Sequence, residues 1–524
     1  MAVIDFFDRG FRIDPDGDYL LCGDQRYTYR QAHEITCRIA NGLIAAGCAK
    51  EAKAAVWATN DPLAWLCTLA IWRAGLAWVP INYRNASEEN GYILAAFDCE
   101  VLFFQAAFAE QIAALKAALP KVRHYICIDG EAPGAIAMQP WMAAQATSVP
   151  QVTTAMEDVC ALMPTGGTTG RPKGVMNTHR SISTMVANWL SVMSYPVNQH
   201  SEMQRPVNLA AAPLTHTAGL FSLMAAARGG TLVIIPRPEP ALLLDAIERH
   251  RITELFLPPT VIYMLLDLPG IEKRDFSSLR YFLYGAAPMS VEKLKRALRT
   301  FGPVMIQGFG QSEAPAGVAC LEPAEHFRNG GFAPDSTLAS CGRPFALTQV
   351  SIQNDRNEIL PDGEVGEICV RGDILMKGYY KDPERTAETV VNGWLHMGDV
   401  GFIDPNGYLH ITDRKKDMII SGGFNVFSAE VEGVLNSHLA VQDCAVIGVP
   451  DEKWGEAVKA VVELNPGMSA TAEELIALCK EKLGSVKAPK TVDFVAKLPR
   501  SPVGKVLKRS VREPFWAGKE RQIN

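Results

Sequence analysis

Apolar runs long enough to cross a membrane are missing from this sequence of 524 residues. The most apolar long window, Trp65 to Ile81, is interrupted by Arg73 and Pro80, whereas a membrane-spanning helix needs roughly 20 apolar residues. The opening segment, residues 1–18, carries acidic side chains where a secretory signal would have a basic and then an apolar stretch. We therefore expect a soluble, cytoplasmic protein without a membrane span.

Clustered metal ligands and an excess of positive charge are missing as well. The twelve cysteines are scattered, no pair is as close as Cys-X-X-Cys, and no His-Glu-X-X-His motif occurs. This spacing argues against structural zinc and favours buried thiols in a reducing cytoplasm. The formal net charge of -6 gives no general attraction for polyanions, so nucleic acid is not an expected partner.

The sequence does contain the alternation of helices and strands that is typical of α/β proteins. Hydrophobic residues make up 48% and charged residues 21% of a chain long enough for several folded units. Thr28 and Gln31 form a capping box at the start of a predicted helix. Strand-like runs at 54–59 and 77–81 enclose a helical stretch at 63–73, which predicts a βαβ unit.

A second series of strand-like runs extends from 159–164 to 304–310 and predicts a second α/β sheet. After about residue 340 hairpin signals dominate, with Asn406-Gly407 at the turn of a predicted hairpin over 402–411. From about residue 417 the order of elements is that of a small α+β domain.

These patterns together predict a fold class. We expect a large α/β N-terminal domain, residues 1–413, with two α/β sheet subdomains and a small β-rich module. Residues 414–524 would form a small mobile α+β C-terminal domain. The charged run 413–417 joins the two without a low-complexity linker, which indicates a hinge.

The segment 163–174, MPTGGTTGRPKG, concentrates glycines, hydroxyls and cations after a strand-like run. Glycines let backbone N–H groups approach phosphate oxygens, threonines donate further hydrogen bonds, and Lys173 supplies charge. A Walker A loop needs Gly-Lys followed by Ser or Thr, whereas here Pro172 precedes Lys173 and Gly174 follows it. The segment therefore predicts a phosphate loop of another kind. The residues expected to contact phosphate are Thr165, Gly166, Gly167, Thr168, Thr169, Gly170 and Lys173.

This segment closely resembles the phosphate loop of the adenylate-forming (AMP-binding) superfamily, which includes acyl-CoA synthetases, luciferases and the adenylation domains of peptide synthetases. The resemblance favours the acyl-CoA synthetase branch, the acid:CoA ligases. It implies the use of ATP, Mg²⁺ and coenzyme A, with a carboxylic acid converted to acyl-AMP and then to acyl-CoA. Other segments resemble the superfamily's motifs in the same order: YGAAP (284–288), QGFGQSEAP (307–315), GWLHMGDVG (393–401), DRKKDMIISGGFNV (413–426) and LPRSPVGKVLKR (498–509).

The resemblance implies roles for particular residues. Glu313, with Thr168, would hold Mg²⁺, for which a carboxylate is a suitable ligand. Asp399 would accept hydrogen bonds from the ribose hydroxyls, Arg414 would reach the nucleotide, and Lys505 would be the adenylation lysine. The catalytic residues implied are Lys505, Thr168, Glu313 and His216, and the other nucleotide contacts implied are Gly285, Ala286, Ala287, Pro288, Gln307, Gly308, Phe309, Gly310, Gln311 and Ser312.

One nucleotide position departs from the usual pattern. The superfamily usually has tyrosine where Phe309 stands, so the stacking face is kept and the hydroxyl is lost.

The remaining implied residues concern domain rotation, coenzyme A and the acid. Lys416 would take the hinge position. His216 would lie beside the acyl carboxylate, although a lone histidine is more often part of a core. Trp454 could equally be a packing residue. The implied coenzyme A contacts are Gly422, Gly423, Trp454, Arg84 and Lys487, and the implied acyl pocket consists of His216, Phe221, Thr260, Tyr263 and Tyr284.

Other functions remain open at this point. An amino-acid-activating domain needs a carboxylate near His216 to bind the substrate ammonium, and residues 211–224 contain no Asp or Glu. A luciferase-like oxygenase would share the adenylate, and a non-catalytic nucleotide sensor would share the fold. The acid itself is open among aryl-propenoic, benzoic, medium-chain and longer fatty acids, and a homodimer is one assembly left open.

Overall fold

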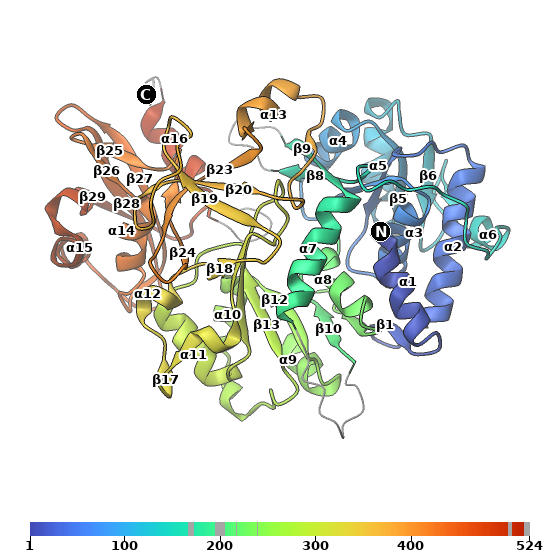
Figure 1. The fold of residues 1–524 in the computed structure, drawn as a ribbon, viewed down its shortest axis with the longest axis horizontal. Helices are drawn as coiled ribbons and strands as arrows, with labels where there is room; N and C mark the ends of the chain where they lie inside the picture. Colours follow the sequence, from blue (N-terminus) through green and yellow to red (C-terminus); the bar gives the residue numbers. More distant parts are fainter. Residues whose placement is uncertain (166–171, 194–204, 216, 238, 501–505, 518–524) are drawn as a thin grey trace.

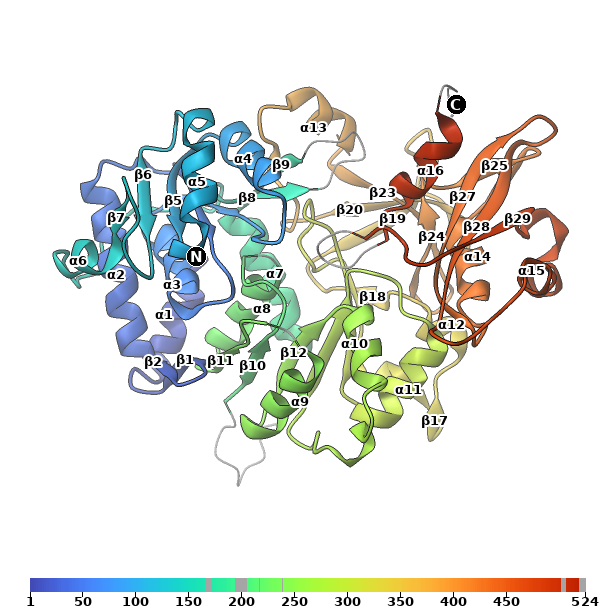
Figure 2. The ribbon, with the colours of Figure 1, turned by 180° about the vertical axis from the view of Figure 1, so that it is seen from behind.

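The computed structural model describes residues 1–165, 172–193, 205–215, 217–237, 239–500 and 506–517. Figure 1 shows three regions side by side: a blue N-terminal region, a green and yellow region, and an orange and red C-terminal region. Figure 2 shows the same three regions from behind, with the blue region now on the left. Among the described residues, no helix is both long enough and apolar enough to cross a bilayer.

The first sheet contains the predicted βαβ unit. Helix α2 (Tyr29–Ala45) begins at the capping box, where Thr28 Oγ1 accepts a hydrogen bond from Gln31 N at 3.2 Å and Gln31 Oε1 accepts one from Thr28 N at 2.9 Å. Helix α3 (Pro62–Arg73) joins the parallel strands β3 and β4, as predicted. The strands, in their order across the sheet, are β21 (Gly378–Tyr379), β9 (Lys173–Thr178), β8 (Val159–Thr165), β4 (Ala77–Pro80), β3 (Lys53–Trp57), β5 (Cys99–Phe104), β6 (His124–Cys127) and β7 (Ile136–Ala137).

Strand β8 corrects one expectation, because the predicted run 159–164 belongs to this first sheet and not to the second. It lies beside β4, with Trp78 opposite Ala161, and pairs antiparallel with β9. After the N-terminal strands β1 (Asp18–Cys22) and β2 (Gln25–Thr28), the chain returns to the second sheet only after α7 (His179–Val192). Sheet membership is decided by long-range hydrogen bonds, so the order of strands along the chain did not reveal it.

The second sheet is also predominantly parallel and carries the other predicted strands. The N-terminal strands β1 and β2 join it beside β11. Its strands, in order across the sheet, are β18 (Arg343–Pro344), β15 (Ala319–Leu321), β14 (Met305–Phe309), β13 (Tyr281–Gly285), β12 (Glu254–Leu257), β10 (Val207–Ala210), β11 (Thr231–Ile234), β1 (Asp18–Cys22) and β2 (Gln25–Thr28). The helices around the two sheets are α1 (Ile4–Ile13), α4 (Ser87–Ala96), α5 (Ala109–Leu115), α6 (Met138–Ala143), α8 (Thr217–Ala226), α9 (Pro240–Arg249), α10 (Pro259–Leu266), α11 (Val291–Phe301) and α12 (Asp335–Leu338).

The β-rich module contains the predicted hairpin. Strands β23 and β24 pair antiparallel around a turn in which Gly407 has a φ of 81°. The pairing places Asp399 directly opposite Arg414. The module consists of β19 (Gln349–Gln353), β20 (Gly366–Arg371), β22 (Val390–Val391), β23 (Trp394–Ile403) and β24 (Leu409–Arg414), with α13 (Pro383–Thr389) nearby.

The C-terminal region has a hydrophobic core of its own, which includes Ile419, Val446, Val458 and Leu475. Its hairpin β25–β26 and its last helix, α16, were not anticipated from the sequence. The region confirms the predicted combination of a large α/β part and a smaller α+β part. Its elements are β25 (Ile419–Ser421), β26 (Phe424–Val426), α14 (Ser428–Leu435), β27 (Val441–Asp451), β28 (Gly455–Leu464), α15 (Ala472–Lys487), β29 (Thr491–Val495) and α16 (Lys508–Trp516).

Candidate active site

The predicted phosphate loop joins two antiparallel strands. Thr165 ends β8, Lys173 begins β9, and the two residues pair directly. A strand rather than a helix therefore begins at Lys173, unlike the Walker A arrangement. The predicted contacts Gly166, Gly167, Thr168, Thr169 and Gly170 lie outside the described residues.

Lys173 and Glu313 are brought together by a tyrosine that the motifs did not indicate. The Tyr379 hydroxyl donates a hydrogen bond to Glu313 Oε1 at 2.9 Å, and Lys173 Nζ lies 5.6 Å from the centre of the Tyr379 ring. Burial lowers the pKa of Lys173, and the nearby Arg385 lowers it further. Little in the sequence indicates Tyr379, because it lies in none of the motifs and 66 positions from Glu313.

The two segments predicted to enclose adenine are adjacent at the carboxyl ends of parallel strands. Gly285 on β13 pairs with Gly308 on β14, and a Cβ at Gly285 would lie 2.4 Å from the Gly308 carbonyl oxygen. Ligands of α/β sheets bind at this end of the strands. Ala286 follows with a φ of 65°, a costly conformation for a residue with a side chain that often marks a functional site.

Gln307, on the same edge, carries a buried Oε1 atom without a hydrogen-bond partner in the described part of the chain. Such an acceptor costs about 1–3 kcal/mol when it stays unsatisfied. It therefore suits a ligand that carries a donor, such as the amino group of adenine. Phe309 and Gly310 follow it as half-buried residues.

Three predicted residues from separate segments meet at Asp399. This buried carboxylate accepts a hydrogen bond from Gln311 Nε2 at 2.6 Å and pairs with Arg414 Nε at 2.6 Å. The predicted hinge residue, Lys416, follows in a turn, and burial together with Arg414 lowers its pKa. Polar groups from the segment after β14, from β23 and from the end of β24 thus converge in one place.

The predicted coenzyme A residues do not all come together. Gly422 and Gly423 form the β25–β26 turn with φ values of 59° and 80°, and a Cβ at Gly422 would lie 2.6 Å from the Trp454 ring. Lys487 forms an ion pair with Glu430 at 2.7 Å, which offsets its charge.

Arg84 is an exposed residue after β4 and donates a hydrogen bond to the neighbouring Tyr83 hydroxyl at 3.1 Å. The lysines that lie over the Trp454 ring are Lys453, at 4.8 Å, and Lys490, at 5.8 Å. The motifs indicated neither lysine, although Lys490 ends the same short KAPK run that Lys487 begins.

The predicted acyl residues lie on two faces of the second sheet. Phe221 belongs to the core that includes Trp189, with 5.3 Å between the two ring centres. Tyr284 belongs to the opposite core and lies 3.0 Å from His326 Nε2, and the Tyr263 hydroxyl accepts a hydrogen bond from Ser290 N. A pocket shared by all of them would have to lie at the edge of the sheet. Thr260 is half-buried on α10, and His216 lies outside the described residues.

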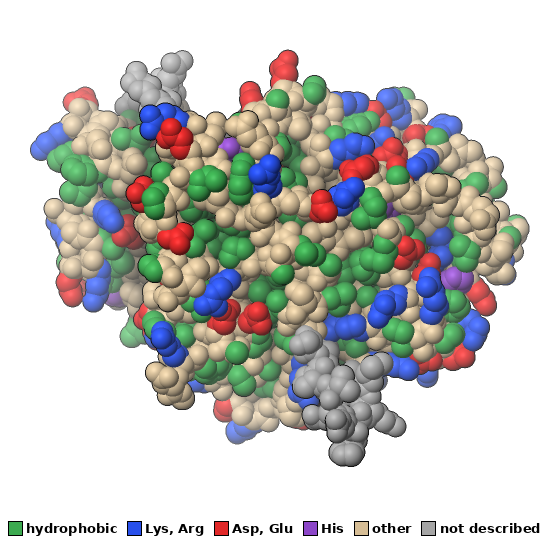
Figure 3. Space-filling view, in the orientation of Figure 1, with side chains coloured by type: hydrophobic (Ala, Val, Ile, Leu, Met, Phe, Trp, Pro, Cys, Tyr) green, Lys and Arg blue, Asp and Glu red, His purple; other side chains and the backbone are tan. Residues whose placement is uncertain are grey.

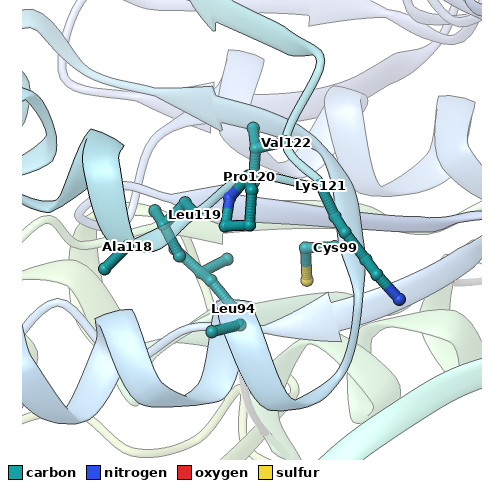
Figure 4. Close-up of a pocket in the computed structure, with 8 residues that line it drawn as sticks. Leu94, Cys99, Ala118, Leu119, Pro120, Lys121 and Val122 are labelled. Carbon is teal, nitrogen blue, oxygen red and sulfur yellow. The ribbon is translucent and has the colours of Figure 1, made fainter.

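A separate apolar pocket of about 180 Å³ lies among α4, β5 and residues 118–122 (Figure 4). Leu94, Leu119 and Val122 line it, and burial raises the pKa of its Cys99 thiol. None of its lining residues is a predicted site residue. With a single lysine, Lys121, among them, this pocket does not suit a triphosphate.

Comparisons with known proteins identify the family of the chain. The chain matches the AMP-binding enzyme family over residues 7–380 and the AMP-binding enzyme C-terminal domain over residues 430–505. It is 37% identical over 510 residues to a feruloyl-CoA synthase of an Amycolatopsis species, covering 97% of this chain and 98% of that protein.

A medium/long-chain-fatty-acid–CoA ligase, FadD8 of Mycobacterium tuberculosis, is 41% identical over 374 residues, which cover 70% of this chain and 63% of that protein. The match thus spans less than two thirds of that relative's length. Among solved structures, the amide bond synthetase McbA of Marinactinospora thermotolerans superposes with a TM-score of 0.87 and 31% identity, covering 98% of this chain and 100% of that chain.

The chain therefore belongs to the AMP-binding enzyme family, the adenylate-forming superfamily. Within it, the chain belongs to the acyl-CoA synthetase branch and is an AMP-forming acid–thiol ligase that uses ATP and coenzyme A.

Proposed function

We propose that this acid:CoA ligase acts on a free apolar acid, aromatic or fatty, and couples it to free coenzyme A in two steps. The acid would attack ATP to give acyl-AMP and pyrophosphate, and the coenzyme A thiol would then displace AMP. The convergence of Gln311, Asp399 and Arg414 beside the paired strands β13 and β14 is the observation that carries the nucleotide site. The absence of Asp and Glu from residues 211–224 supports an acid without an ammonium group.

In the first step a carboxylate and ATP, both anions, must be held in line while charge on the α-phosphate is offset. Lys173 and the loop that ends at it would hold the outgoing pyrophosphate, and Lys505 would contact the attacking carboxylate and the α-phosphate. Glu313 and Thr168 would hold Mg²⁺. The Glu313 carboxylate fits this cation because it supplies oxygen ligands. It interacts with Lys173, at the end of the predicted phosphate loop, where the metal could also meet phosphate oxygens. Bound there, the metal would draw charge from the phosphate oxygens.

Nucleotide binding would combine polar and stacking contacts. Asp399 has two acceptor oxygens for the ribose hydroxyls, and Arg414 would hold it in place. The buried Gln307 Oε1 would accept from the adenine amino group, and Phe309 would stack on the ring.

In the second step the small domain, residues 414–524, would turn about Lys416 relative to residues 1–413. The turn would withdraw Lys505 and bring Gly422, Gly423 and Trp454 to the pantetheine arm. Lys453 and Lys490 beside Trp454 are better placed than Lys487 to meet the phosphates of coenzyme A, since Lys487 is paired with Glu430. Arg84 remains a candidate from the large domain.

The hinge gives a prediction of its own. Proline fixes φ near about -65° and removes an N–H, so Lys416→Pro should hold the domains in one arrangement. We expect this variant to keep acyl-AMP formation and to lose most of its coenzyme A-dependent turnover. The matched variant, Lys416→Ala, should retain both half-reactions, measured separately as pyrophosphate exchange and as AMP release from acyl-AMP. Normal thioester formation by the proline variant would remove Lys416 from the hinge.

A panel of acids tests the proposed function. Aryl-propenoic, benzoic, medium-chain and long-chain acids are each supplied with ATP, Mg²⁺ and coenzyme A, and AMP and acyl-CoA are measured. We expect at least one of these acids to give acyl-CoA, and free α-amino acids to give no pyrophosphate exchange, since an ammonium would lack a counter-charge. Exchange with an amino acid at the rate of the best simple acid would favour an amino-acid-activating enzyme, and oxygen-dependent light emission would favour a luciferase-like reaction. No pyrophosphate release with any acid would favour a nucleotide sensor.

Surface charge and the cysteines support the proposed partners and the proposed cytoplasmic location of the enzyme. Acidic and basic side chains are interspersed on the face shown in Figure 3, which supports small molecules rather than nucleic acid as partners. The scattered cysteines support a reducing cytoplasm, because none of those described is in a disulfide. Light scattering, which measures the molar mass in solution, would test whether the enzyme forms a homodimer.

A further inference from the structure

A chain of hydrogen bonds joins the start of the last helix to the end of the large domain. Lys508 Nζ, at the start of α16, donates to Ser428 Oγ at 2.7 Å and pairs with Glu432 Oε1 at 2.8 Å. Ser428 Oγ in turn donates to Asp413 Oδ1 at 2.9 Å, and Ser428 N donates to Asp413 Oδ2. Three separate elements, β24, α14 and α16, therefore meet through four side chains.

Separating the side chains of this hydrogen-bonded cluster would cost folding free energy. Ser428 and Asp413 are 0% and 3% exposed, and a buried charge without its partner destabilises a protein strongly. Burial raises the pKa of Glu432 to about 7, in spite of Lys508. Burial lowers the pKa of Lys508, but Glu432 and Asp413 together raise it above its usual value. Asp413 also satisfies the N-terminal backbone N–H of α14, as a capping residue does.

Lys508 follows residues 501–505, which contain the predicted adenylation lysine, by three positions. Residues 501–505 lie outside the described residues, but their flanks pair, with a bridge between Arg500 and Val506 and a hydrogen bond from Leu507 N to Pro499 O at 2.8 Å. On one flank, Arg500 pairs with Asp443 and Glu463, both within the small domain.

On the other flank, the contacts of Lys508 cross to Asp413. That residue lies at the end of the large domain, next to Arg414 and three positions before Lys416. Arg500 thus pairs within its own domain, whereas Lys508 connects the start of α16 to the domain junction.

We propose that Lys508 is a positioning residue for adenylation, which links the segment after Lys505 to the hinge through Ser428, Glu432 and Asp413. The inference rests on the proposed function, because it takes Lys505 as the adenylation lysine. Lys508 would act through the placement of its neighbours and would not touch the substrate. A small displacement of a reacting group is enough to slow a reaction greatly.

The test is Lys508→Met, which keeps the length of the side chain and removes its charge. We expect acid-dependent ATP–pyrophosphate exchange to fall by roughly 100-fold in kcat, with the KM for ATP little changed. AMP release from supplied acyl-AMP and coenzyme A should stay near the wild-type rate. Lys508→Arg should restore much of the exchange, because a guanidinium can still pair with Glu432. The matched control is Arg509→Met at the exposed neighbour that pairs with Glu513, and it should behave like the wild type.

A second variant separates positioning from folding. Glu432→Gln combined with Lys508→Met removes the Glu432 carboxylate that Lys508→Met alone leaves unpaired, so it should recover part of the thermal stability without recovering exchange. Recovery of exchange in the double variant, near-normal exchange in Lys508→Met, or an equal fall in both half-reactions would each overturn the inference. Wild-type enzyme without exchange on any acid would instead remove the proposed function itself, and the inference with it.

Discussion

Lys505→Ala is expected to lower acid-dependent pyrophosphate exchange by roughly 100- to 1000-fold, the loss that follows removal of one group that stabilises a transition state. The lysine would offset charge on the carboxylate and the α-phosphate only while the adenylate forms. The second half-reaction should therefore proceed at much of its normal rate when purified acyl-AMP and coenzyme A are supplied. Both half-reactions are measured on the same preparation, so a loss of folded protein would be seen in each.

Lys497→Ala is the matched control for this prediction. Lys497 is an exposed lysine of the same basic run, and its replacement should leave both half-reactions near normal. An equal loss of both half-reactions in Lys505→Ala would remove Lys505 from the adenylation step.

Asp399→Ala should weaken ATP binding by a large factor. Each hydrogen bond between a charged group and the ribose is worth about 1.5–3 kcal/mol, and the substitution also leaves Arg414 without its carboxylate partner. We expect the KM for ATP to rise by roughly tenfold or more, with a smaller change in the KM for the acid. The measurement is initial-rate kinetics with each substrate varied in turn.

Two variants control for damage to the hairpin. Asp399→Asn keeps the shape and one acceptor oxygen and should bind ATP better than the alanine variant. Asp404→Asn lies at the turn of the same β23–β24 hairpin, where its carboxylate accepts from Asn406 N and Tyr408 N, and it should alter stability more than ATP binding. An unchanged KM for ATP in Asp399→Ala would exclude a ribose contact.

Local features of the fold could be predicted from the sequence because their determinants are neighbours in the chain. The capping box of Thr28 and Gln31 and the Asn406-Gly407 hairpin depend on residues within a few positions of each other. The sheet to which β8 belongs depends on hydrogen bonds with β4, from a distant segment, and was predicted wrongly. Helix α16 was missed because its short basic sequence contains Pro514, which usually disfavours a helix.

In the candidate site, too, the sequence motifs indicated some residues and not others. The motifs named Gln311, Asp399 and Arg414, and these three are in contact. They did not name Tyr379, because its role follows from a hydrogen bond to a carboxylate far away in the sequence. The motifs also could not show that Lys487 is paired with Glu430, since ion pairs depend on side-chain direction in the folded protein.

The central claim, that the acid attacks the α-phosphate of ATP to form an acyl adenylate, can be tested by following the oxygen atoms. An acid accepted in the panel is labelled with oxygen-18 in its carboxyl group and converted with ATP and coenzyme A, and the products are analysed by mass spectrometry. The carboxylate oxygen that bonds to the α-phosphorus stays with the nucleotide when the thiol displaces AMP. The account predicts labelled AMP together with unlabelled pyrophosphate. Label in inorganic phosphate with release of ADP, or acyl-CoA formed with unlabelled AMP, would contradict it.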